Sequence, residues 1–237
     1  SERGRVLLDA ARRLRELTKD VATLETLDTS RPIAETLVVD VKSVTDCLEY
    51  FGGAAALLQS GETVRAGPGP QSITYTLREP LGVAACIGAF NYPLQSCGWK
   101  VAPALAFGNA VVFKPSEHTP LSALVFAEIL KQAGLPPGVF SVVLGKGDVG
   151  HQLVSHPQIS KVSFTGSVAT GVRITQNAAQ ALKKTTMELG GKGPLIIFPD
   201  ADLDKAVTVA MLANFYSNGE VCSNGTRVFV HDSIHDA

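Results

Sequence analysis

The sequence has few of the features that mark several protein classes. It contains only four cysteines, and their irregular spacing favours free thiols in a reducing compartment over a disulfide framework. Its formal net charge is −1 and no basic run stands out, so nothing indicates nucleic acid as a partner. We assign no metal ligands.

Long hydrophobic runs are also missing. The longest, such as residues 82–90, are far too short to cross a bilayer. Residues 1–16 form an arginine-rich amphipathic pattern that includes acidic residues, unlike a secretory signal. Because 45% of the residues are hydrophobic, a buried core is within reach. We therefore expect a globular, cytoplasmic protein that has no membrane partner.

Helical patterns occupy the first part of the chain. Apolar residues three and four positions apart predict one amphipathic helix over residues 4–27. A second helical segment is expected after Pro32, as far as residue 57, and the Gly-Pro-Gly-Pro cluster at 67–70 ends it. Apolar and polar residues then alternate over 72–78, which predicts a strand.

Short apolar runs alternate with helical patterns from residue 81 onward. The runs cover 83–89, 110–113, 139–144, 161–164, 195–198 and 226–230. The helical patterns cover 121–133, 149–154, 168–181 and 203–215. Continuous apolar strands that alternate with helices predict a parallel sheet covered on both faces. The predicted fold class is α/β, a Rossmann-like doubly wound parallel sheet that follows N-terminal helices.

Three separated motifs offer groups for chemistry at a carbonyl carbon. Cys222 lies among small and polar residues, and Glu188 precedes the pair of glycines in Glu-Leu-Gly-Gly-Lys, which we interpret as a loop. Far upstream, Asn91 belongs to Phe-Asn-Tyr-Pro. A thiol nucleophile, a carboxylate base and an amide donor for an oxyanion suit covalent catalysis. The other three cysteines, Cys47, Cys86 and Cys97, are interpreted as small buried hydrophobic residues.

The order F-N-Y-P, K-P-S-E, F-T-G-S, E-L-G-G-K and G-E-V-C resembles the NAD(P)-dependent aldehyde dehydrogenase superfamily over essentially the whole chain. Around Asn91 and Cys222 the sequence is similar to those of betaine-aldehyde and 4-trimethylaminobutyraldehyde dehydrogenases. The resemblance implies an N-terminal helical segment (1–70), an NAD-binding domain (71–190) and the beginning of a catalytic domain (191–237). It also implies homo-oligomeric relatives, and truncation of this chain at both ends, with the assembly strand absent.

The resemblance assigns catalytic roles to four residues. Cys222 attacks the aldehyde, Asn91 stabilises the oxyanion, and Glu188 activates the water that releases the acid. Lys100 resembles a lysine that helps to orient the asparagine, although a solvated lysine fits the sequence nearly as well. One departure from the family pattern is Glu220, where many relatives carry glutamine.

The resemblance also assigns Lys114 and Glu117 to the hydroxyls of the adenosine ribose. A carboxylate there accepts a hydrogen bond from a 2′-hydroxyl and repels a 2′-phosphate, so NAD is the expected cofactor rather than NADP. The alternative is a solvated Lys/Glu pair on the surface. The other residues expected along the cofactor cleft are Ile87, Phe90 and Leu189.

Two helix starts can meet the phosphates of a dinucleotide. Gly166 and Ser167 precede a helical pattern, and Ser167 can serve as its N-cap as well. Gly147 lies in a G-x-G-x-x-G match over 145–150, which fits a tight turn from strand to helix equally well.

Three aromatic residues suggest the substrate. If Tyr92, Trp99 and Tyr216 converge, they form a wall that attracts a quaternary ammonium group or a protonated amine. Aromatic core packing is the alternative for each ring. We therefore expect NAD-dependent oxidation of an amino- or trimethylammonium-aldehyde, through a thiohemiacetal and a thioester, to the carboxylic acid. A truncated, non-catalytic form that binds dinucleotide or associates with full-length subunits remains an alternative, and a CoA-acylating enzyme is a third, which Glu188 disfavours.

Overall fold

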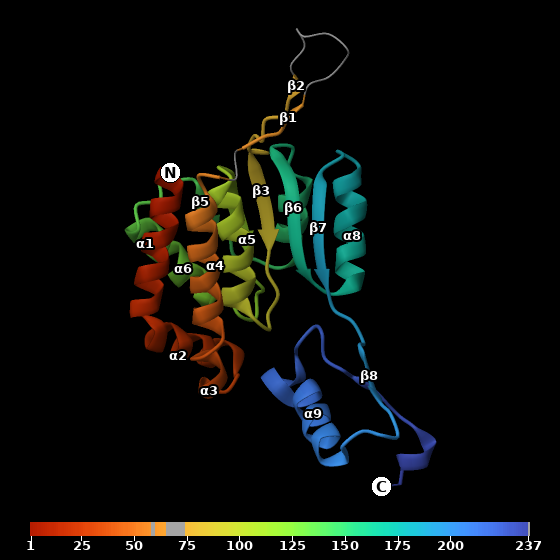
Figure 1. Cartoon of the computed structure of the whole chain (residues 1–237). Helices are drawn as coiled ribbons and strands as arrows, with labels where there is room; N and C mark the ends of the chain where they lie inside the picture. Colours follow the sequence, from red (N-terminus) through yellow and green to blue (C-terminus); the bar gives the residue numbers. More distant parts are fainter. Residues whose placement is uncertain (58–59, 65–73, 237) are drawn as a thin grey trace.

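The chain folds around a five-stranded parallel sheet that is flanked by helices (Figure 1). The computed structural model describes residues 1–57, 60–64 and 74–236. In spatial order the strands are β5 (Phe140–Val142), β4 (Ala110–Lys114), β3 (Val83–Ile87), β6 (Ile159–Gly166) and β7 (Lys184–Leu189). Every neighbouring pair is parallel. The predicted Rossmann-like fold class is confirmed.

Helices cover both faces of this sheet. On one face lie α5 (Pro93–Ala106) and α6 (Leu121–Gln132), and on the other α7 (Gly147–Ser155) and α8 (Val168–Ala179). Strand β3 contributes Ala84 and Cys86 to the core cluster of the first face, and Ala85 and Ile87 to that of the second. Because β3 is buried on both faces, its sequence is apolar throughout.

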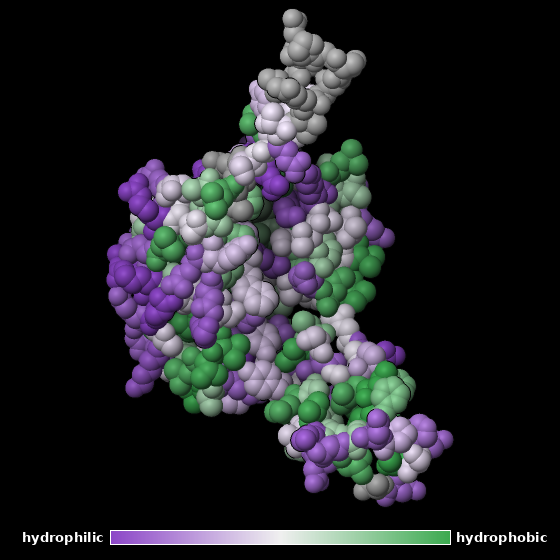
Figure 2. Space-filling view, in the orientation of Figure 1, coloured by the Kyte–Doolittle hydropathy of each residue, from purple (hydrophilic) through white to green (hydrophobic). Residues whose placement is uncertain are grey.

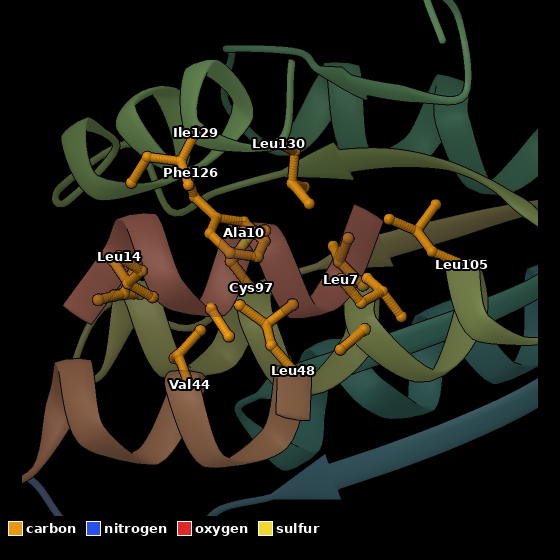
Figure 3. Close-up of a cluster of buried hydrophobic side chains, with 14 of the residues drawn as sticks. Leu7, Ala10, Leu14, Val44, Leu48, Cys97, Leu105, Phe126, Ile129 and Leu130 are labelled. Atoms are coloured by element: carbon orange, nitrogen blue, oxygen red, sulfur yellow. The ribbon is translucent and has the colours of Figure 1, made fainter. Parts of the chain in front are cut away.

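Helices α1 (Glu2–Glu16), α2 (Thr18–Thr29), α3 (Ile33–Thr36) and α4 (Asp40–Ala54) precede the sheet. Figure 3 shows how α1 and α4 bury their apolar faces against α5 and α6. A Cβ atom on Gly98 of α5 would lie 2.5 Å from Val44 Cγ1 of α4, so only glycine allows these helices to pack this closely. The labelled side chains are Leu7, Ala10, Leu14, Val44, Leu48, Cys97, Leu105, Phe126, Ile129 and Leu130.

The single helix predicted over 4–27 is wrong. At Leu17 the backbone leaves the helical region (φ −94°, ψ 12°), and the chain divides into α1 and α2. The Thr18 hydroxyl donates to the Arg15 carbonyl oxygen at 2.7 Å, a local bond that competes with the regular helical pattern. The segment predicted after Pro32 likewise divides into α3 and α4.

Strand β7 was not predicted, because it lies at the edge of the sheet. Its sequence, Lys-Thr-Thr-Met-Glu-Leu, has mostly exposed side chains and no apolar run. Glu188 therefore lies on a strand, in register with Thr165 of β6, and not in a loop as predicted. Of the strand predicted over 72–78, the structure contains β2 (Thr74–Tyr75), which pairs with β1 (Thr63–Val64). Residues 72–73 of that prediction, and the Gly-Pro-Gly-Pro cluster at 67–70, lie outside the described residues.

The last part of the chain contains the predicted strands and helix. Strands β8 (Pro194–Ile197) and β9 (Arg227–Val230) form a parallel pair, and α9 (Leu203–Phe215) lies between them in sequence. The short 3₁₀ turn η1 (Tyr216–Gly219) follows α9, and η2 (Asp232–Ile234) follows β9. No residue of α9 is buried. Figure 2 shows hydrophobic surface gathered over this region. The exposed apolar residues include Ile196, Phe198, Val207, Val209, Met211, Leu212, Phe215 and Phe229.

Two carboxylates of α2 cap the helices of the sheet layer. Glu25 Oε1 accepts from the Leu94 amide of α5 at 3.2 Å, and Asp28 Oδ2 accepts from the Leu121 amide of α6 at 2.9 Å. Neither α5 nor α6 has a side-chain cap from its own N-cap residue. Helix α2 therefore supplies acceptors that the first turns of α5 and α6 would otherwise lack.

Burial of Glu25 should make stability depend on pH. Burial, with the neighbouring Asp40 charge, raises the pKa of Glu25 from 4.5 to about 7. Since the folded chain holds this proton more tightly than the unfolded chain, the free energy of unfolding should fall by up to roughly 3 kcal/mol as pH rises between these values. Denaturant titrations from pH 4.5 to 8 should show this slope in the wild type and a flatter one in Glu25→Gln.

The matched control is Glu128→Gln on the surface of α6. Hydrogen bonds, first from Gln132, lower the pKa of Glu128, so it titrates below this range. An equal slope in Glu25→Gln and in the wild type would contradict the prediction.

Candidate functional site

A large cleft of about 1710 Å³ is lined by residues from both ends of the sheet and includes the carboxyl ends of its strands. The chain crosses over to opposite sides of the sheet after β3 and after β6, and ligands of open α/β sheets bind at such a switch point. Every motif singled out from the sequence contributes to the lining. The predicted site residues that line it are Ile87, Phe90, Asn91, Tyr92, Trp99, Lys100, Lys114, Glu117, Gly147, Gly166, Ser167, Glu188, Leu189 and Cys222.

Cys222 has an exposed thiol in the loop after α9. Just before it the chain turns through three left-handed residues, Ser217 (φ 54°), Asn218 (φ 57°) and Gly219 (φ 74°). This conformation is unfavourable for residues other than glycine, so surrounding contacts must hold it. The buried Asn224 supplies one of them, because its side-chain amide donates to the Asn214 carbonyl oxygen at 3.4 Å.

Asn91 connects this loop to the sheet. Its Nδ2 donates to the Glu220 carbonyl oxygen at 2.7 Å, across 129 positions of sequence. Asn91 lies between β3 and α5, so the bond places the loop of Cys222 beside the end of the central strand. An amide nitrogen carries two hydrogens, which leaves one for a further acceptor such as an oxyanion.

Glu188 opens into the same cleft as Cys222. Its side chain is exposed on β7, and the glycines after it pass close to the cysteine loop. A Cβ atom on Gly191 would lie only 3.9 Å from the Cys222 carbonyl oxygen. The carboxylate and the thiol therefore reach one space from two different elements.

Lys100 contacts a residue that the sequence did not single out. Its Nζ donates to Ser163 Oγ of β6 at 3.1 Å, rather than to Asn91. Burial lowers the pKa of Lys100, and the nearby Cys86 and Glu188 act in the opposite direction. On β6, Ser163 lies two positions after Lys161, so the alternation of side chains along a strand puts both residues on the same face of the sheet. This alternation is the sequence signal that could have indicated Ser163. That Lys100 orients Asn91 stays a prediction.

Lys114 and Glu117 lie at the end of β4. Lys114 is buried with 4% of its surface exposed, donates to the Pro115 carbonyl oxygen at 2.9 Å and lies 3.7 Å from the Glu117 carboxylate. It is therefore not a solvated surface lysine. Glu117 is exposed, and a hydrogen bond from its own backbone, together with the Lys114 charge, lowers its pKa.

Two helices begin at the cleft. Ser167 is the N-cap of α8, and its hydroxyl accepts from the Thr170 amide at 3.3 Å. Gly145 has a φ of 154° in the turn before α7, where a Cβ atom would lie 2.3 Å from Val149. The tight turn in the G-x-G-x-x-G match is therefore present, and the free amides of both helix starts suit an anion.

Two of the three aromatic residues line the cleft. Tyr92 and Trp99 line the cleft, and Trp99 Nε1 donates to Ser43 Oγ of α4 at 3.0 Å. Tyr216 is outside the lining, and burial, with Glu35 and Tyr92 nearby, raises its pKa. No sequence signal indicated the residue behind Tyr92, which is Arg31, with its Cζ 4.0 Å from the ring centroid.

Comparison with known proteins decides the family. The model of the aldehyde dehydrogenase family matches residues 1–237, the whole chain. The chain belongs to the aldehyde dehydrogenase family. It is 60% identical over 235 residues to betaine aldehyde dehydrogenase of Mesorhizobium japonicum, and 57% identical over 237 residues to betaine aldehyde dehydrogenase 2 of Rhizobium meliloti.

The matched relatives are longer than this chain. The alignments cover 99% and 100% of the chain but only 47% and 48% of the two relatives, so the chain spans about half of their length. A solved NAD⁺ complex of Staphylococcus aureus betaine aldehyde dehydrogenase superposes with a TM-score of 0.94 at 39% identity. That superposition covers 99% of this chain and 46% of the solved one.

The described residues contain neither a membrane-spanning helix nor a cluster of metal-binding side chains. No helix there is both long and apolar enough to cross a membrane. No cluster of three or more His, Cys, Asp or Glu residues there could hold a metal ion.

Removing the Asn91 amide should loosen the cysteine loop of this aldehyde dehydrogenase chain. A hydrogen bond contributes about 1 kcal/mol, so in Asn91→Ala the backbone amides of residues 220–224 should exchange hydrogen about five-fold faster. Hydrogen–deuterium exchange with peptide resolution measures this. Asn177→Ala, which removes a side-chain amide bonded to Ser155, is the control. Unchanged exchange in Asn91→Ala would show that other contacts hold the loop.

Proposed function

We propose that this chain carries the dinucleotide site and the nucleophile of an NAD-dependent dehydrogenase that oxidises an aldehyde bearing a trimethylammonium or amino group. The observation that carries the proposal is one cleft that contains Asn91, Glu188 and Cys222 beside the two helix starts. In this proposal residues 71–190 bind the dinucleotide, residues 191–237 present the nucleophile, and residues 1–70 support the cleft from behind.

The residues at the cleft suit a dinucleotide. The Glu117 carboxylate can accept from a ribose hydroxyl, and the buried Lys114 beside it fixes one positive charge there. The starts of α7 and α8 offer backbone amides to a pyrophosphate. NAD, when bound, accepts a hydride from the substrate. A relative of known structure holds NAD⁺, which supports the same cofactor here.

Cys222 forms the covalent bond to the substrate. Its thiolate attacks the aldehyde carbon, and the C–S bond forms as the carbonyl electrons move to oxygen. The second hydrogen of the Asn91 amide, the one not donated to Glu220, is free to stabilise that oxyanion. Loss of hydride leaves a thioester on Cys222.

Glu188 completes the reaction. A water molecule loses a proton to the Glu188 carboxylate and attacks the thioester carbon, and the C–S bond breaks to release the acid and the thiolate. The position of Glu188 on a strand, instead of a loop, favours this role, because a strand holds the base in one place. Tyr92 and Trp99, which line the cleft, and the names of the relatives support a cationic aldehyde.

One observation favours a second candidate function. The exposed apolar surface of α9, β8 and β9 is typical of a surface that packs against other protein. The second candidate is therefore a chain that binds dinucleotide and associates with another polypeptide through this surface, without turnover of its own.

Substitution of Cys222 should abolish turnover. With NAD and betaine aldehyde, formation of NADH by Cys222→Ala should be slower than in the wild type by about 10³-fold or more, since the covalent route is lost. Absorbance of NADH measures the rate. Cys47→Ala is the control, because burial raises the pKa of Cys47 to about 11 and makes that thiol unreactive. A folded wild-type chain that binds NAD without turnover would instead favour the second candidate.

Glu117 should set the preference for NAD over NADP. Its lowered pKa keeps it ionised at neutral pH, where it repels a 2′-phosphate by roughly 1 kcal/mol. Glu117→Gln should therefore lower the ratio of the NADP dissociation constant to the NAD dissociation constant by about five-fold. Calorimetric titration of both dinucleotides measures the ratio, with Glu128→Gln as the control. A ratio unaffected by Glu117→Gln would place the ribose elsewhere.

A further inference from the structure

Arg31 is a fully buried cation on the hidden side of Tyr92. Its side chain has no exposed surface and does not line the cleft, whereas Tyr92 does. Nη1 donates to Asp40 Oδ1 at 2.8 Å, and Cζ lies 4.0 Å from the centroid of the Tyr92 ring. One face of the ring is thus covered by a guanidinium group that comes from the α2–α3 connection.

The contact with Tyr92 is one of few that hold this guanidinium. Within the described residues, Nε and Nη2 of Arg31 have no hydrogen-bond partner. A buried charge needs compensation, and here the ion pair with Asp40 and the face of the aromatic ring provide it. Because Asp40 is itself fully buried, the guanidinium has little freedom to move, and neither has the ring.

The surrounding carboxylates compensate the charge of Arg31. Asp40 is paired with Nη1, and a Glu35 oxygen lies 3.9 Å from Nη2. Two carboxylates around one guanidinium leave no excess positive charge behind Tyr92. The ring, which has no uncompensated cation behind it, therefore keeps the negative electrostatic potential on its face that attracts a cation.

Trp99, another aromatic residue of the cleft lining, is held in a similar way. Trp99 Nε1 donates to Ser43 Oγ, so a residue of α4 fixes its orientation. Tyr92 and Trp99 therefore both have partners in the N-terminal helical region, which contributes little to the cleft itself.

We propose that Arg31 is a positioning residue for substrate selection, which fixes the plane of Tyr92 so that its opposite face meets the cationic head of the aldehyde. This inference rests on the proposed function, in which the substrate is a cationic aldehyde. Arg31 does not touch the substrate and acts only through the ring.

Binding of choline tests the proposal without turnover. Choline carries the trimethylammonium group, and the alcohol in which carbon replaces its nitrogen is a neutral molecule of the same shape. Trp99 is the sole tryptophan of the chain, so its fluorescence reports binding in the cleft. The quantity of interest is the ratio of the two dissociation constants, because a general loss of packing would weaken both ligands alike.

In Arg31→Met the preference for choline over the neutral alcohol should fall about 3- to 30-fold. Arg31→Lys, which keeps a cation behind the ring, should restore much of it. Arg31→Met combined with Asp40→Asn removes both charges of the buried pair and serves if the single variant does not fold, with circular dichroism as the check.

The outcomes separate the two proposals. A wild-type preference for choline that is unchanged or larger in the folded variants would overturn the role of Arg31 and leave the cationic substrate standing. Equal binding of choline and the neutral alcohol by the wild type would overturn both. A reduced ratio with rescue by Arg31→Lys supports the positioning role.

Discussion

Buried charge behind the start of α5 is the constraint on which the site depends. Asn91 and Tyr92 immediately precede this helix, and its first turn is capped from α2 by Glu25. Arg31, which is paired with Asp40, stacks on the Tyr92 ring from the same side. Placing such groups away from water is unfavourable unless each meets a defined partner, so the arrangement tolerates little displacement. The residues that face the cleft are thus located by residues that never reach it.

The site joins two parts of different character. The sheet side is buried and regular, whereas the loop of Cys222 is exposed and contains consecutive left-handed residues. The bond from Asn91 to the Glu220 carbonyl oxygen joins them. One amide thereby sets the distance between its own remaining hydrogen and the thiol, and these are the two groups that must act on the same carbonyl.

Much of this architecture could be predicted from the sequence, because strands buried on both faces leave continuous apolar runs and the ends of parallel strands share one edge. The convergence of Asn91, Lys114 and Ser167 follows from that rule, whereas Cys222 follows no strand of this sheet. Strand β7 escaped prediction because an exposed edge needs no apolar run. The contact between Arg31 and Tyr92 could not be predicted, because packing between segments that are distant in sequence produces no periodic pattern of residues. Tyr216 precedes the cysteine closely, yet it lies outside the cleft lining.

The order of the core along the chain has a consequence for how the protein emerges from the ribosome. The buried residues of the larger cluster all lie between Leu7 and Leu130, and β4 and β5 add their pairing by residue 142. The smaller cluster needs Ile159 to Ala178, which arrive later and pair with the other side of β3. During synthesis the first half of the sheet can therefore fold on its helices while β3 still exposes one edge. That edge is a temporary template for wrong partners until β6 closes it.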